Sequence, residues 1–204
     1  MNTTARHIDV LKELINVGLS HAVATYDEAA TIPIHVRISS VTAVESPVHA
    51  FEAMKVSGGP LVGARLRFQG EWPGVGEAVF PLQTALALAS CVQGTEDRNN
   101  SKYLDALRSG SVFEICSEFI SGAVSSINIH QKCLRYDIPQ YVEYPRGWSG
   151  KAISIGADSV TLTSRGIVRV GHRDYRGSVV IAIDAGEFDR LITAIDERVR
   201  EQVC

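Results

Sequence analysis

Two long stretches of the sequence, about Arg6–Ala30 and Lys102–Ile129, have the apolar periodicity of an amphipathic helix. The first contains no proline, whereas Gly110 interrupts the second, so we expect one long helix and then two helices that meet near Gly110. A helix of this kind is stable mainly because its apolar face packs against other elements. The rest of the chain must therefore supply a surface that covers two long apolar faces.

The remaining segments supply strands. Apolar alternation and β-branched residues predict strands, bounded by turn residues, at 32–38, 61–69, 75–80, 136–144, 151–155, 160–163, 167–170 and 178–183. Pro81 suits the first turn of a further helix over 82–92, and 185–203 closes the chain as an amphipathic helix. This order predicts an α+β fold, with helices packed on a mostly antiparallel sheet. The segment 41–54 fits either a helix or a strand.

Composition excludes several classes of protein. The chain has 204 residues, 45% of them hydrophobic and 21% charged, which is enough for a packed core. A net charge of -3 and the lack of a basic tract argue against nucleic acid as a partner. We expect no membrane segment, because no apolar run approaches 18 residues, and a cytoplasmic location. Four cysteines without metal-ligand spacing predict reduced thiols, at least two of them buried.

The first long helix carries a narrow polar stripe. A helix advances about 100° per residue, so with Asp9 at zero, Glu13 lies near ~40°, Asn16 near ~340° and Ser20 near ~20°. The opposite face is apolar or small, with Leu11, Leu14, Ile15, Gly18 and Ala22. Such a stripe is typical of any solvated helix face, and the pattern alone leaves that interpretation open beside a binding or catalytic one.

The second long helix repeats this arrangement 101 residues later. Its stripe consists of Gly110, Glu114, Ser117 and Ser121. Glu13, Ser20, Ala22 and Val23 match Glu114, Ser121, Ala123 and Val124 in identity. Because the offset is close to half the chain, we predict one pseudo-two-fold domain over residues 1–204, made of two worn repeats of about 1–101 and 102–204.

The stripe and the residues after it resemble a known signature. Asp9-x-x-x-Glu13-x-x-Asn16, continued as Asn16-Val17-Gly18-Leu19-Ser20-His21-Ala22, resembles the motif of the CheC, CheX and FliY family of chemotaxis phosphatases. The resemblance covers nearly the whole chain and implies a CheC-like fold with two such helices. There are two departures. The family often has a proline where Ser39 stands here, and the second motif has Ser117 in place of the carboxamide.

This resemblance implies a phosphatase that removes the aspartyl phosphate of a CheY-type response regulator. Asn16 would position the attacking water, and Glu13 would pair with an active-site lysine of the regulator. Asp9, Ser20, Glu114 and Ser117 would contact the partner. The chain would need no cofactor or metal of its own, because Mg²⁺ would belong to the regulator.

Two alternatives stay open. The first is a CheC-like binding module with little catalysis that docks on a response regulator or on a CheD-like deamidase. The second is a flagellar switch component like FliY, which the absence of an extra C-terminal switch domain disfavours. The sequence leaves the oligomeric state, the regulator and any activity of the Ser117 site open.

Other motifs have simpler interpretations. Gly74-x-Gly76 precedes a strand and predicts a turn, not a phosphate loop. The six histidines are dispersed and form no metal-binding pair. Trp72 and Trp148 lie in segments that contain proline and glycine, where we expect them to anchor loops.

Overall fold

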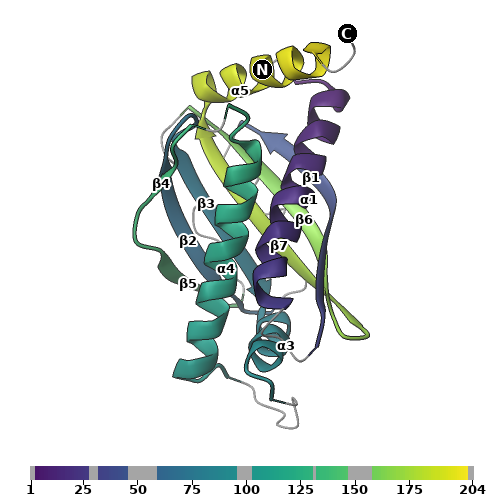
Figure 1. The fold of residues 1–204 in the computed structure, drawn as a ribbon. Coiled ribbons are helices and arrows are strands. Elements are labelled where there is room, and N and C mark those ends of the chain that lie inside the picture. Colours follow the sequence, from purple (N-terminus) through teal and green to yellow (C-terminus); the bar gives the residue numbers. More distant parts are fainter. Residues whose placement is uncertain are drawn as a thin grey trace.

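A computed structural model describes residues 3–27, 32–45, 59–95, 103–130, 132–146 and 158–201. Its elements follow the chain in the order α1 (Ala5–Asp27), β1 (Ile34–Val44), β2 (Leu61–Gln69), β3 (Gly74–Pro81), α3 (Leu82–Val92), α4 (Ala106–Ile127), β4 (Arg135–Tyr136), β5 (Gln140–Tyr144), β6 (Ser159–Val170), β7 (Arg173–Asp184) and α5 (Ala185–Glu201). Figure 1 shows α1 and α4 side by side on one face of the sheet, with α5 across one end and α3 at the other. The predicted α+β class is confirmed.

The strands form one antiparallel sheet in the order β1-β6-β7-β3-β2-β4, and β5 also pairs with β2. When β5 is taken in place of β4 beside β2, the order β1-β6-β7-β3-β2-β5 is unchanged by reversing it and exchanging β1, β2 and β3 with β5, β6 and β7. Each of the central strands β3 and β7 also continues directly into a helix, α3 or α5. Two equivalent halves would produce this symmetry, although the origin of the chain by duplication stays a prediction.

The long helices approach each other closely at two glycines. A Cβ atom built on Gly18 would overlap the carbonyl oxygen of Gly122, and one built on Gly122 would overlap that of Gly18. The backbones touch there because neither residue has a side chain. Gly18 lies on the apolar face of the first helix, so the small residues of that face allow this close approach.

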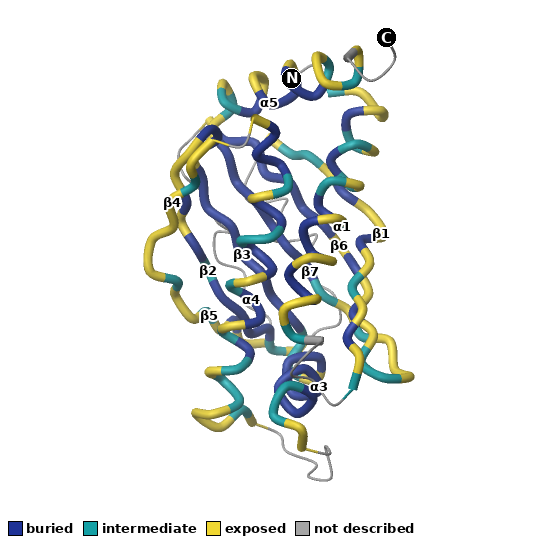
Figure 2. The backbone as a smooth tube through the Cα atoms, in the orientation of Figure 1, coloured by how far each residue is buried: buried dark blue, intermediate teal, exposed yellow. Residues whose placement is uncertain are grey.

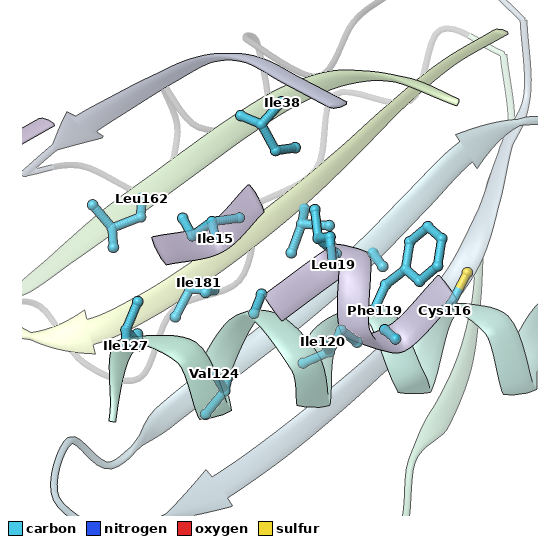
Figure 3. Packing of buried hydrophobic residues seen from close by; sticks show 14 of the residues in the cluster. Ile15, Leu19, Ile38, Cys116, Phe119, Ile120, Val124, Ile127, Leu162 and Ile181 are labelled. Carbon is cyan, nitrogen blue, oxygen red and sulfur yellow. The ribbon is translucent and has the colours of Figure 1, made fainter. Parts of the chain in front are cut away.

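The core lies between the helix pair and the sheet. Ile15 and Leu19 of α1 are fully buried, as is Ile120 of α4 (Figure 3). Phe119 of α4 meets Phe80 of β3 edge to face, with ring centroids 5.9 Å apart. Burying a side chain of this size contributes roughly 1.5–3 kcal/mol, so this layer fixes α1 and α4 on the sheet. Figure 2 shows the outer sides of both helices exposed.

Two predicted interruptions are wrong. Helix α4 runs unbroken over Ala106–Ile127, because Gly110 is exposed in its first turns and no tertiary contact forces a bend there. The pieces predicted at 160–163 and 167–170 belong to the single strand β6, because the residues between them pair with both neighbouring strands. The ambiguous segment begins as strand, with 41–44 in β1, and 46–58 lies outside the described residues, as does the strand predicted at 151–155.

Trp72 anchors its loop as predicted: it is buried, and its Nε1 donates to the Ile127 carbonyl at 3.1 Å. Trp148 lies outside the described residues. Cys91 and Cys116 are buried, which confirms the prediction that at least two thiols are. Of the helices within the described ranges, none is both long and apolar enough to cross a bilayer.

Candidate functional site

The polar stripe of α1 lies on its outer side. Asp9, Glu13 and Ser20 are exposed, and the Ser20 hydroxyl donates to the Asn16 backbone carbonyl at 2.8 Å. Glu13 and Asn16 are three residues apart in the helix, so their side chains leave the same face about one turn from each other. The described structure thus brings this carboxylate and this carboxamide together.

Asn16 differs from the expectation of an exposed side chain. It is half-buried, and its Oδ1 accepts a hydrogen bond from the backbone N–H of Ile38 at 2.7 Å. The strand register shifts between Ile38 and Ser40, so this N–H lies at a β-bulge of β1. The donor is a backbone N–H, so the acceptor must be the amide oxygen, and the NH₂ group makes no hydrogen bond with the described residues. The carboxamide therefore ties α1 to β1 as well as facing outward.

Sequence reasoning missed this bulge, although one signal pointed to it. Ser39, the position where the resembled family often has proline, lies within the bulge next to Ile38. Its hydroxyl donates to the Arg165 carbonyl of the neighbouring strand at 3.0 Å. The long spacing from Asn16 to this position therefore reflects a tertiary contact between the helix and the edge strand.

The stripe of α4 is built differently. Glu114 is exposed, whereas Ser117 is half-buried and its hydroxyl donates to the Phe113 carbonyl of the same helix at 2.8 Å. α1 and α4 run in opposite directions (Figure 1), which places Glu13 and Glu114 toward opposite ends of the helix pair. The two stripes are therefore separate surfaces, and the second offers a carboxylate without a carboxamide.

A groove separates the two stripes. It has a volume of about 450 Å³ and includes Val17 and His21 of α1 and Glu118 and Ser125 of α4 in its lining. Val17 is 51% exposed, which is unusual for an apolar residue beside a groove. Burial, followed by the carboxylates of Glu118 and Glu114, raises the pKa of Tyr26, so the α4 side of this surface is electrostatically negative.

One buried polar cluster was not predicted. Glu77 of β3 is fully buried; its carboxylate accepts from Arg65 Nε at 2.9 Å and from the Tyr144 hydroxyl at 2.8 Å. Burial raises the pKa of Glu77, and Arg65 and Tyr144 act against that rise. The lone carboxylate inside the apolar run of 75–80 was the available signal. No group of three or more His, Cys, Asp or Glu among the described residues is arranged to hold a metal.

Comparison with known proteins identifies the fold. The chain superimposes on FliY from Thermotoga maritima with a TM-score of 0.78 and 13% identity, covering 97% of this chain and 99% of that one. The FliM middle domain from H. pylori gives 0.64 at 7% identity (94% and 99% covered), and a CheC-like superfamily protein from Shewanella sp. PV-4 gives 0.53 at 12% (84% and 97%). The predicted resemblance to the CheC, CheX and FliY family is thereby confirmed at the level of the fold.

Sequence comparison adds no further relatives. No protein-family model matches the chain, and no curated protein matches it. The chain has the CheC, CheX and FliY fold, which the FliM middle domain shares, and a structural neighbour is the chemotaxis protein CheX from Desulfovibrio desulfuricans.

Proposed function

We propose that this chain docks the outer face of α1 on a CheY-type response regulator and hydrolyses its aspartyl phosphate. One observation carries the proposal: Glu13 is exposed about one helical turn from Asn16, on the first long helix of a CheC-like fold. No other pair of a carboxylate and a carboxamide among the described residues lies on the outer side of the helix pair.

The chemistry requires little from the phosphatase itself. An acyl phosphate has a good leaving group, and its hydrolysis needs a water molecule aligned with the phosphorus. Asn16 positions that water, and its neutral amide does not repel the phosphoryl group. Glu13 forms a charge-assisted pair with the regulator's active-site lysine and so sets the approach of Asn16. Mg²⁺ belongs to the regulator.

The hydrogen bond from the Ile38 N–H to Asn16 Oδ1 affects the rate at which Asn16 can act on water. The Ile38 N–H occupies one of the two lone pairs of the amide oxygen, so a water molecule either uses the other lone pair or replaces the Ile38 N–H. Replacing a neutral hydrogen bond costs about 0.5–1.5 kcal/mol, and about 1–3 kcal/mol if the N–H stays unpaired. Since 1.4 kcal/mol is about tenfold in rate, replacement of the Ile38 N–H would slow hydrolysis by about twofold to a hundredfold without preventing it.

The same bond favours a second function, which is docking without hydrolysis. One lone pair of the Asn16 amide oxygen accepts from the Ile38 N–H and the Ser117 hydroxyl is directed at its own helix, so neither stripe presents a fully unengaged carboxamide for water. In this second function the exposed Glu13 and Glu114 would contact a regulator or a CheD-like deamidase. Structural neighbours support a role in binding, because solved structures of H. pylori FliM include complexes with FliG and SpeE.

Phosphate release from a phosphorylated CheY-type regulator with Mg²⁺, measured with and without this protein, separates the two functions. If the chain hydrolyses the phosphate, release should exceed the regulator's own rate. This additional release should fall by at least about tenfold in Asn16→Asp. Asp retains the oxygen that accepts from Ile38 and adds a charge that repels the phosphoryl group. Binding of the regulator with no excess release supports the binding module. Absence of binding to any tested regulator and to a CheD-like deamidase overturns both.

A further inference from the structure

A second cavity lies at the α3 end of the molecule, among α3, the start of β1 and the turn between β6 and β7. Its volume is about 620 Å³, within the range of about 300–1,000 Å³ typical of small-molecule sites. Ile32, Ala87 and Val170 contribute to its largely apolar lining. It shares no lining residue with the groove between α1 and α4, and it plays no part in the proposed phosphatase reaction.

The walls of this cavity are held by bonds between the three elements. The Cys91 thiol of α3 donates to the Ile32 carbonyl at 3.0 Å, and Gly171 N–H donates to the Pro33 carbonyl at 3.1 Å. Gly171 has a φ of 59°, which a residue with a side chain adopts only with strain, so glycine permits this tight turn. The cavity is therefore largely preformed, which lowers the entropy cost of binding.

The described part of the lining carries one arginine and no acidic residue. Arg173 and His172 belong to it, and none of the described lining residues is Asp or Glu. The nearby Asp174 is engaged elsewhere, because its two carboxylate oxygens accept from Arg169 at 2.6 and 3.0 Å. Arg173 makes no hydrogen bond or ion pair with the described residues. A guanidinium without a counter-ion at the edge of an apolar cavity attracts an anion.

We propose that this cavity binds a small amphipathic monocarboxylate. Its apolar body packs against Ile32, Ala87 and Val170, and its carboxylate pairs with Arg173. A single planar guanidinium fits a single carboxylate through two parallel hydrogen bonds. A phosphate group would call for more donors than this lining supplies.

The test compares 2-naphthoate with 2-naphthamide, an uncharged ligand of nearly the same shape. Calorimetric titration of the full chain should show naphthoate binding at least about tenfold more tightly, since a charge-assisted pair is worth about that factor. Amide NMR shifts should change at Gly171 and His172. Arg173→Gln should reduce the preference for naphthoate to within about twofold. Arg176→Gln, which removes the same charge from an exposed residue of β7 outside the cavity, should preserve the preference.

Three results would overturn the proposal. They are no binding of either ligand at about 1 mM, equal affinity for both ligands in the wild-type chain, and an equal loss of preference in Arg173→Gln and Arg176→Gln. Shift changes confined to the groove between α1 and α4 would also contradict it. Both substitutions are at exposed positions, so circular dichroism should show each variant folded.

Discussion

The outer faces of α1 and α4 have similar sequences and different roles. Each presents an exposed glutamate, Glu13 or Glu114, three residues before a half-buried polar side chain. In α1 that side chain is Asn16, which reaches a bulge of the edge strand β1, whereas in α4 it is Ser117, which bonds only to its own helix. A helical motif therefore acquires its role from the element that packs beside the helix. Four experiments test this contrast.

The largest effect should come from the glycine contact on which both helices depend. Gly18→Val places a branched side chain where the Gly122 carbonyl lies, so the helices must separate. We expect a loss of about 3 kcal/mol or more in the free energy of unfolding, measured by urea denaturation. Gly110→Ala is the control: it meets nothing within 4 Å and should stabilise the helix by about 0.5–1 kcal/mol. Equal stability of the two variants would contradict the close contact.

The next effect separates the structural roles of the two stripes. Asn16→Ala leaves the Ile38 N–H at the bulge without its acceptor, so we expect a loss of about 1–2 kcal/mol in the free energy of unfolding. Asn16 therefore contributes to the stability of the fold as well as to the outer face of α1. Ser117→Ala should change stability by less than about 0.5 kcal/mol, because its hydroxyl bonds only within α4. A wild-type urea midpoint for Asn16→Ala would show that the bond contributes nothing.

A third experiment restores the missing carboxamide on α4. In Asn16→Asp most of the phosphate release above the regulator's own rate should be lost. Adding Ser117→Asn should raise this release a few-fold over that of Asn16→Asp if Glu114 pairs with the same regulator lysine. Because Glu13 and Glu114 lie toward opposite ends of the helix pair, the recovered activity should be sensitive to Glu114→Ala and insensitive to Glu13→Ala. Recovery that depends on Glu13 would mean that the two stripes act as one site.

The smallest effect concerns pH and the negative side of the groove. Burial, with Glu118 and Glu114, raises the pKa of Tyr26 above its ordinary value of 10.0. Above pH 10 the unfolded chain loses the Tyr26 proton while the folded chain keeps it, so the free energy of unfolding falls as pH rises. The decline between pH 10 and 11 should be shallower in Tyr26→Phe than in the wild-type chain, measured from urea midpoints. Identical slopes would show that folding does not raise the pKa of Tyr26.

Much of the fold was predictable from the sequence because apolar periodicity is a local property. The pattern of α1 predicted Leu11, Ile15 and Ala22 on its buried face, and the alternation of 61–69 and 75–80 predicted β2 and β3. Local reasoning failed at Gly110, because the cost of about 1 kcal/mol for a glycine is small beside the packing of the whole helix. It also split β6, where pairing on both sides outweighs weak local propensity.

The sequence by itself determined which side chains leave the outer faces of α1 and α4, since helical geometry fixes direction from spacing alone. It determined the exposed positions of Asp9, Glu13 and Glu114 in this way. Only the tertiary structure decided that Asn16 meets the bulge of β1, because that contact joins residues 22 apart through the packing of a helix on a sheet. Hydrogen bonds between elements depend on where the backbones finally lie, and side-chain spacing within one element carries no information about that position.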